Sequence, residues 1–309
     1  MAHRKPSPVA RSPNGRIQVS AVVAPAKTES KGFGHPETGR CLIMGVLNVT
    51  PDSFSDGGRY LAVSDAVQQG LSLVREGADV VDVGGESTRP GAQRVSESEE
   101  LHRVIPVVSA LARVGASVTI DTMRSRVAAA AIAVGAVGVN DVSGGLADPK
   151  MPAFISDARV PYVLNHWRAT HGVMSHRAEY RDVVRDVVTE LRQRLDVFER
   201  AGADMDRVIV DPGLGFAKTA EHNWQILGGL AEIRQIERPV LIGASRKSFL
   251  RKLISSDDAV ATPRDLDTAT AAVSALAATA SVYCVRVHDV ASTVVALKTS
   301  AAWIAAQHE

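Results

Sequence analysis

The stretch Val118–Asn140 reads VTIDTMRSRVAAAAIAVGAVGVN and contains one complete β-α-β unit. Val118–Ile120 and Val137–Val139 are short apolar runs rich in β-branched residues, which is typical of parallel strands covered by helices. Between them, Arg124–Val134 has the periodicity of an amphipathic helix, and Gly135 stands where that helix would stop. The stretch therefore predicts two parallel strands joined by a helix.

The same unit recurs along the chain after residue 40. Six further apolar runs have the composition of buried strands, namely Leu42–Leu47, Val80–Val83, Tyr162–Leu164, Val208–Val210, Val240–Ile242 and Val282–Val287. Helical periodicity marks, for example, Asp65–Glu76, Glu97–Val114, Tyr180–Ala201 and Leu266–Ser281. About eight such units in succession favour an α/β fold built as a single closed (β/α)₈ TIM barrel over a doubly wound sheet.

Helix boundaries can also be read from the sequence. Ser96 is followed by Glu97 and Glu99, which predicts an N-cap with an acidic first turn. Gly77, Gly115 and Gly202 each stand where a helix would end before the next strand, as Gly135 does in the opening unit.

The bulk composition excludes several classes of protein. Lys and Arg number 35 and Asp and Glu number 34, so no global field draws the chain to nucleic acid or to an anionic membrane surface. No apolar stretch reaches the roughly 18 uncharged residues of a membrane-spanning helix. The two cysteines, Cys41 and Cys284, lie in apolar runs that would form the first and last strands. We predict free buried thiols, with a disulfide between adjoining strands as the alternative.

Residues 1–38 differ from the remainder of the chain. They are rich in Pro and in basic residues and contain no acidic residue before Glu29, which predicts a disordered arm before a catalytic domain at residues 39–309. The acid-poor composition would suit a transit peptide, and Val19–Ala26 a signal peptide, but Ser20 and Pro25 interrupt this short apolar run. A cytoplasmic protein is the simpler prediction.

Each predicted strand ends on polar side chains. They are Asn48, Asp82, Asp121, Asn140, Asn165 with His166, Asp211, Lys247, and Arg286 with His288. One such residue would be an ordinary turn or helix-cap residue. Eight endings together indicate an enzyme, because the carboxyl ends of the strands in a barrel converge on one pocket.

These polar residues fall into two groups, which differ in the kind of ligand that they could bind. Asp121, Asn140 and Asp211 can accept and donate along the edge of a nitrogen heterocycle, although hydrogen bonding between neighbouring strand ends would also account for them. Arg286 and His288 alternate across one residue, so they point to the same side and can grip one phosphate. The chain shows no nucleophilic triad, so we expect chemistry without a covalent enzyme intermediate.

Two loops follow the first two strands. Residues 48–58 surround Phe54 with turn residues, which suits either a plain connection or a lid over a flat substrate. Residues 84–91 carry Arg89 between glycines but match neither a P-loop nor a dinucleotide-binding pattern.

These segments resemble the motifs of the dihydropteroate synthases, and most closely those of actinobacterial members. The likeness runs in order through residues 42–58, 82–92, 120–122, 140–145, 211–216, 243–249 and 286–288. It implies a transferase of folate biosynthesis that joins 6-hydroxymethyl-7,8-dihydropterin pyrophosphate to p-aminobenzoate and releases pyrophosphate and 7,8-dihydropteroate. It also implies Mg²⁺ as a cofactor, small-molecule substrates, a homodimer, and competition by sulfonamides.

The resemblance assigns a role to each site residue. A pterin site would comprise Asp82, Asp121, Asn140, Asp211, Phe216, Gly243 and Lys247. A p-aminobenzoate pocket would comprise Phe54, Thr88, Arg89, Pro90 and Ser245. A pyrophosphate site would comprise Asn48, Arg286 and His288, with Asn48 also binding Mg²⁺. Catalysis would depend on Lys247, Arg286, His288 and Asp121.

One residue departs from the family pattern. Members of the family carry Met where this chain has Asn165, so we expect either looser packing of the pterin or an added hydrogen bond. A pterin-binding paralogue without catalysis is therefore an alternative, supported by Asn165 and the arm. A pterin-dependent methyltransferase is another, but it would have no reason to keep Phe54, residues 88–90 or the pyrophosphate clamp.

Overall fold

The structure is a computed structural model that describes residue 33 and residues 40–50, 58–86, 94–168, 178–256 and 260–306. The strands in these ranges are β1 Leu42–Asn48, β2 Val80–Gly84, β3 Val118–Asp121, β4 Gly138–Asp141, β5 Tyr162–Asn165, β6 Val208–Asp211, β7 Leu241–Ile242 and β8 Cys284–Val287. The α-helices are α1 Gly58–Glu76, α2 Glu97–Arg113, α3 Ser125–Ala133, α4 Met151–Ala158, α5 Val183–Arg200, α6 Ala220–Gly228, α7 Leu230–Ile233, α8 Ser248–Ile254, α9 Pro263–Thr279 and α10 Val290–Ala305.

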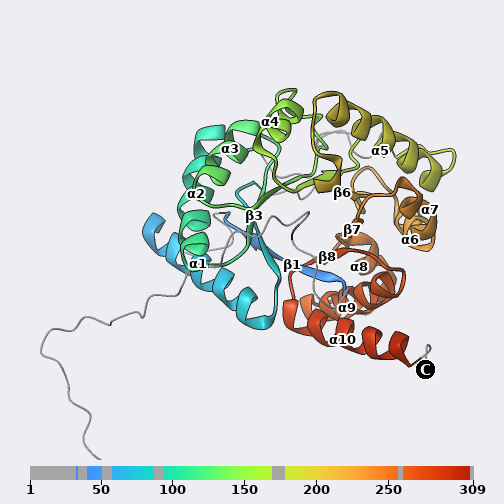
Figure 1. Cartoon of the computed structure of the whole chain (residues 1–309). Coiled ribbons are helices and arrows are strands. Elements are labelled where there is room, and N and C mark those ends of the chain that lie inside the picture. The colour runs from blue at the N-terminus through green and yellow to red at the C-terminus, as the bar shows by residue number, and fades with distance from the viewer. Residues whose placement is uncertain are drawn as a thin grey trace, which may run out of the picture.

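The eight strands form one parallel sheet that curls into a barrel, with the helices around it (Figure 1). Strand order is β6-β5-β4-β3-β2-β1-β8-β7, and a parallel bridge between Val210 and Val240 joins the two ends of the sheet. The predicted (β/α)₈ barrel is thus confirmed. Strand β8 begins later than predicted because the amide of Val282 donates to the carbonyl of Ala277, 3.1 Å away, and so still belongs to the turn after α9.

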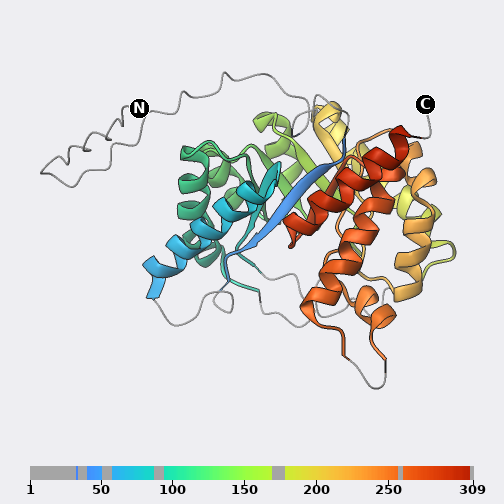
Figure 2. The same cartoon turned by 90° about the horizontal axis from the view of Figure 1, so that it is seen from below.

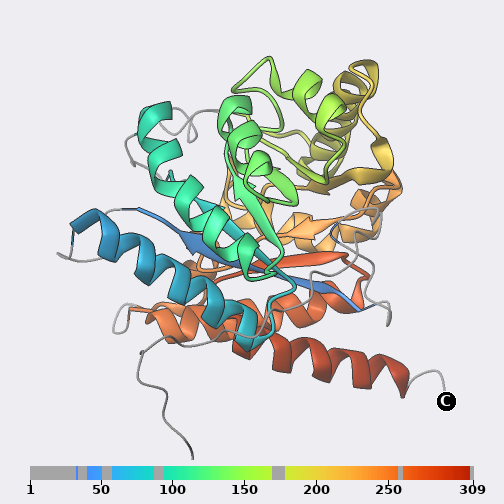
Figure 3. The same cartoon turned by 60° about the vertical axis from the view of Figure 1, so that its left-hand side comes forward.

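The helices occupy the places that their sequence patterns predict. Ser96 caps α2, accepting a hydrogen bond from the amide of Glu99 at 3.1 Å. Gly135 follows α3 at φ +113°, a conformation that L side chains rarely adopt, which accounts for glycine at this helix end. Figures 2 and 3 show α1 and α10, the first and last helices, beside β1. No helix in the described ranges is long and apolar enough to cross a membrane.

Apolar side chains fill one end of the barrel interior. Leu42 and Met44 of β1 join Val80, Val163, Ile209, Leu241 and Cys284 in a buried cluster. Phe33 and Tyr283 pack against it, and the amide of Phe33 donates to the Tyr283 hydroxyl at 3.0 Å. Polar chemistry is therefore confined to the opposite end, where the strands finish.

The prediction of free buried thiols for the two cysteines is confirmed. Cys41 and Cys284 are free, and both are buried. Strands β1 and β8 are neighbours, with Leu42 paired to Cys284. The thiols thus lie on adjoining strands without being joined.

Candidate active site

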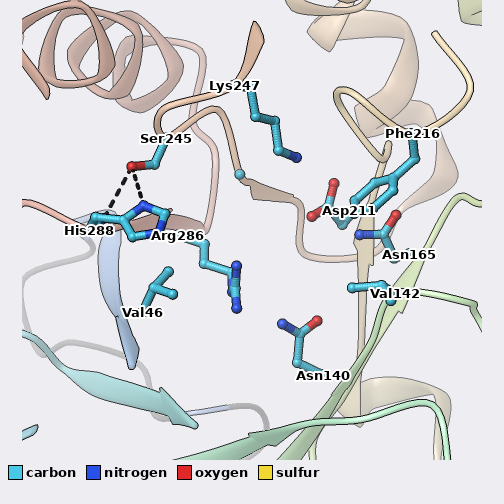
Figure 4. Close-up of a pocket in the computed structure, with 11 residues that line it drawn as sticks. Val46, Asn140, Val142, Asn165, Asp211, Phe216, Ser245, Lys247, Arg286 and His288 are labelled. Atoms are coloured by element: carbon cyan, nitrogen blue, oxygen red, sulfur yellow. Dashed lines mark hydrogen bonds between the residues drawn. The ribbon is translucent and has the colours of Figure 1, made fainter. Parts of the chain in front are cut away.

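A cavity opens at the carboxyl end of the barrel. Its lining residues come from five neighbouring strand ends and from β1, and they are Val46, Asn140, Val142, Asn165, Asp211, Phe216, Gly243, Ser245, Lys247, Arg286 and His288 (Figure 4). The wall combines apolar surface with convergent polar groups, as small-molecule sites do.

Asp211 is held in a tight turn after β6. One of its carboxylate oxygens, Oδ1, accepts a hydrogen bond from the amide of Gly213 at 2.7 Å. Gly213 has φ +71°, and a Cβ there would lie 2.1 Å from the carbonyl oxygen of His166, so only glycine fits. Burial raises the pKa of Asp211, while the nearby ammonium of Lys247 opposes that rise. The other carboxylate oxygen, Oδ2, has no hydrogen bond to any described residue and can accept one from a ligand.

Lys247 faces Asp211 from the segment between β7 and α8. Its ammonium donates to the carbonyl of Leu214 and lies 4.8 Å from the centre of the Phe216 ring. Burial lowers the pKa of Lys247 to about 8, although Asp211 favours the charged form. Near neutral pH the side chain is thus a cation and a hydrogen-bond donor at the cavity wall.

Arg286 is anchored by two buried carboxylates. Its Nε donates to Asp82 and its Nη2 to Asp121, each at 2.7 Å. Asp82 also accepts hydrogen bonds from the hydroxyl of Thr119 at 2.6 Å and from the amide of Asn140 at 2.8 Å. Burial raises the pKa of Asp121, and Arg286 counteracts the rise. The guanidinium is therefore fixed in position before any ligand binds.

His288 lies beside Arg286 and is positioned by Ser245. The Ser245 hydroxyl is 2.9 Å from Nδ1 of His288 and accepts a hydrogen bond from the His288 amide at 3.1 Å (Figure 4). The prediction that Arg286 and His288 share one side of their strand is confirmed, because both line the cavity.

A second basic residue, Lys218, lies behind the Asp211 turn. Its ammonium donates to the carbonyls of Gly213 and Phe216 at 3.0 and 3.1 Å and lies 2.9 Å from Nδ1 of His166. Burial lowers the pKa of Lys218 to about 7 and that of His166 to about 4. No sequence pattern indicates a role for this residue, since a Lys in a loop is usually solvated.

A chain of polar groups continues from His166 toward the surface. Nε2 of His166 lies 3.0 Å from Glu190, and Arg168 donates to the same carboxylate. Burial opposes ionisation of Glu190, but these hydrogen bonds lower its pKa to about 2. A neutral His166 that accepts from Lys218 and donates to Glu190 satisfies all of these contacts.

The structure brings most of the predicted site residues together. Asn140, Asp211, Phe216, Gly243, Ser245, Lys247, Arg286 and His288 all line the cavity. Asp82 and Asp121 instead lie beneath Arg286, so the predicted ring-binding set and anion clamp are one connected network. Asn48 ends β1, outside the cavity lining. Phe54, Thr88, Arg89 and Pro90 lie outside the described residues.

Comparison with known proteins decides the family. Residues 44–288 match the model of the pterin binding enzyme family. The chain is 52% identical over 264 residues to a dihydropteroate synthase of Mycobacterium leprae, covering 85% of this chain and 93% of that protein. The chain belongs to the dihydropteroate synthase family. The predicted resemblance, including its actinobacterial leaning, is confirmed.

Solved structures of dihydropteroate synthases have the same fold. The Xanthomonas albilineans dihydropteroate synthase with 4-aminobenzoic acid has a TM-score of 0.79 at 41% identity, covering 87% of this chain and 94% of that one. A Yersinia pestis dihydropteroate synthase in complex with a sulfonamide drug has a TM-score of 0.80 at 35% identity, covering 87% and 96%. The chain is accordingly an enzyme of the transferase class that functions in folate biosynthesis.

Proposed function

We propose that the protein condenses 6-hydroxymethyl-7,8-dihydropterin pyrophosphate with p-aminobenzoate by a dissociative displacement assisted by Mg²⁺. The observation that carries this proposal is the division of the cavity wall. In Figure 4, Asp211, Lys247 and Phe216 lie on one side of the cavity, and Arg286 and His288 lie on the other. A heterocycle that carries a pyrophosphate fits such a wall, with its ring on the first group and its anion on the second.

The ring-binding side supports a pterin. The free oxygen of Asp211 can accept N–H bonds from the amino-pyrimidine edge, while Lys247 donates to a ring acceptor. Phe216 supplies an apolar face beside the Lys247 ammonium. The ring would thus be fixed by groups of complementary polarity in a site from which most water is displaced.

The anion-binding side supports a pyrophosphate leaving group. The bond between the pterin methylene carbon and the pyrophosphate oxygen breaks first, and negative charge develops on that oxygen. Arg286, already held by two carboxylates, needs no reorganisation to stabilise it. The electron-rich pterin bears the positive charge left on the methylene carbon until the amine nitrogen bonds to it, and the proton of the amine leaves to pyrophosphate or water.

No strong base is needed for the attack. An aromatic amine is already neutral near pH 7, so the enzyme has to position it rather than deprotonate it. This accounts for the absence of a Ser-His-Asp arrangement among the residues that line the cavity.

The site offers little to a metal ion on its own. Within the described ranges, no group of three or more His, Cys, Asp or Glu side chains could hold a metal ion. Mg²⁺ commonly takes one protein ligand and completes its shell with substrate phosphates and water, which fits a site in which Asn48 supplies an amide oxygen. Bound in this way, Mg²⁺ would neutralise part of the charge of the leaving pyrophosphate.

We also propose a cytoplasmic homodimer. Three large apolar side chains are exposed on the paired helices α9 and α10, namely Leu276, Val295 and Trp303 at 69%, 65% and 68%. An exposed apolar surface of this kind is typical of a protein interface. Sedimentation at micromolar concentration, with Trp303→Glu as the perturbing variant, tests the dimer; a monomeric wild-type protein would contradict it.

The proposed activity is tested by incubating the purified chain with both substrates and Mg²⁺ and measuring pteroate and pyrophosphate. We expect both products in equal amounts, inhibition by a sulfonamide, and loss of turnover when the metal is chelated. Binding of both substrates without product would instead assign a pterin-binding protein. Turnover without inhibition by sulfonamide would contradict the proposed p-aminobenzoate pocket.

A further inference from the structure

The turn after β6 carries two residues of the cavity wall on a strained backbone. Asp211 and Phe216 lie on the same side of the cavity in Figure 4. Between and beyond them, Gly213, Gly215 and Ala217 have φ of +71°, +79° and +46°, in the left-handed region. Glycine adopts this region readily, but the Cβ of Ala217 disfavours it. A backbone of this kind persists only where contacts with its surroundings hold it.

Lys218 makes such contacts from behind the cavity. It is not among the residues that line the cavity. Its ammonium donates to the carbonyls of Gly213 and Phe216 at 3.0 and 3.1 Å and lies 2.9 Å from Nδ1 of His166. An ammonium has three N–H donors, and a neutral imidazole with its proton on Nε2 accepts at Nδ1, so all three donors are used. Lys218 therefore ties two points of the turn to the residue that follows β5.

Gly213 connects Lys218 to Asp211. The amide of Gly213 donates to Oδ1 of Asp211 at 2.7 Å, while the carbonyl of Gly213 accepts from Lys218. The amide of His166 donates to the carbonyl of Asp211 at 2.8 Å. Asp211 is thus held on two sides by residues that contact the Lys218 ammonium, although Lys218 and the ligand cavity share no surface.

The charge of Lys218 has a second effect on Asp211. Burial raises the pKa of Asp211, and the positive charges of Lys247, Lys218 and Arg286 oppose that rise. The titratable groups that face Lys218 itself are His166, Asp211, Glu190, Lys247 and Arg168. Without the charge of Lys218, Asp211 would take up a proton more readily and would lose the ionised form, which only accepts hydrogen bonds.

We propose that Lys218 is a positioning residue that holds the Asp211 carboxylate in place for ligand binding through the turn after β6. The inference rests on the proposed function, because it assumes that the cavity binds a heterocycle through Asp211. Lys218 touches no ligand in this role, so its effect on affinity passes through Asp211.

The experiment measures the binding of a 2-amino-4-oxopteridine by calorimetry at pH 5.5 and 7.5. Lys218→Met replaces the ammonium with an apolar side chain of nearly the same length, and Lys218→Gln keeps N–H donors without the charge. Arg238→Met is the matched control. Arg238 also donates to a backbone carbonyl, that of Met205 at 2.9 Å, but Met205 precedes the opposite end of β6.

The loss of affinity should be larger at the lower pH. We expect Lys218→Met to bind the pteridine about tenfold more weakly than the wild type at pH 5.5 and about threefold more weakly at pH 7.5. The pKa of Lys218 is about 7, so the wild type has itself lost part of this charge at pH 7.5. Lys218→Gln should match the wild type within about twofold at pH 7.5 and bind about threefold more weakly at pH 5.5, because it lacks only the charge. Arg238→Met should match the wild type at both pH values.

A double-mutant cycle tests whether the effect passes through Asp211. In Asp211→Asn protein, Lys218→Met should change the affinity at pH 5.5 by less than about twofold, because the carboxylate that Lys218 positions is already gone. A residue that merely stabilised the fold would lower affinity by the same factor in both backgrounds, or in neither. The pH comparison uses single variants, so it decides the proposal even where Asp211→Asn binds the pteridine too weakly to measure.

Three results would overturn the inference. They are wild-type affinity in Lys218→Met, a loss that is equal at the two pH values, and an undiminished loss in the Asp211→Asn background. If Lys218→Met does not fold, Lys218→Gln decides, and a loss that does not grow at pH 5.5 would refute the role. A wild type that does not bind the pteridine would contradict the proposed function instead, so the two failures can be told apart.

Discussion

Replacing Arg286 with Met would leave two buried carboxylates without their cation. Arg286 contacts Asp82 and Asp121 at 2.7 Å each, and these aspartates are 0% and 8% exposed. Removing one partner of a buried ion pair costs about 3–5 kcal/mol, because the remaining charge has no compensation. For a protein of this size we expect the melting temperature to fall by roughly 6–20 °C.

The loss of stability in Arg286→Met should depend on pH. Burial raises the pKa of Asp121 and Arg286 opposes that rise, so the pKa should rise further in Arg286→Met. A carboxyl whose pKa is raised by folding keeps a proton that the unfolded chain has released, so stability falls as the pH rises above about 4. The variant should therefore lose more stability at pH 8 than at pH 5.

Urea unfolding of the wild type, Arg286→Met and the double variant Asp121→Asn/Arg286→Met at both pH values checks this reasoning. The double variant should regain part of the stability, and its unfolding should depend less on pH. A loss below about 1 kcal/mol at pH 8 would refute the anchoring role of Arg286, as would an equal loss at both pH values.

Other predictions address the remaining charged and sulfur groups. Lys247→Ala should weaken ring binding, whereas Arg286→Ala should mainly lower kcat at saturating substrate; steady-state kinetics that show equal loss of both parameters in both variants would contradict this division. Because the pKa of Lys247 is about 8, the ring affinity of the wild type should fall as the pH rises through 8, and Lys247→Ala should lack that dependence. Folding lowers the pKa of Lys218 from 10.5 to about 7, so stability should rise with pH between these values by at most about 1.4 kcal/mol per unit, and Lys218→Met should show a shallower rise in urea unfolding. Burial raises the pKa of Cys41 to about 12, and Cys284 is also buried, so a thiol reagent should modify neither residue in the native protein and both after unfolding.

The barrel could be predicted from sequence because each strand is a short apolar run bounded by helical periodicity. Helices without apolar residues confined to one face were harder to recognise from the sequence. Helix α10 is apolar over most of its length yet exposes Val295 and Trp303, so no polar face marks it out. Helix α4 has eight residues, fewer than three turns, which is too short for a period to stand out.

The residues that form the site could be predicted from the sequence more fully than the contacts between their side chains. Strand ends converge by topology alone, so Asp211, Lys247 and Arg286 could be brought together from the sequence. Which side chains pair across the barrel depends on their length and direction, and Arg286 reaches both Asp82 and Asp121. Lys218 could not be predicted because its contact with His166 joins residues 52 positions apart, and only the fold brings these two residues together.

The narrow junction between β6 and β7 has a consequence for ligand binding. Apart from the bridge between Val210 and Val240, the described residues show no ladder between these two strands. Asp211 is the last residue of β6, and Lys247 follows β7 on the other side of the junction. A ring bonded to both residues would form a cross-link between the strands and complete the circle of hydrogen bonds. Ligand should therefore slow amide exchange in β7 more than in β3, which is paired along both edges before any ligand arrives.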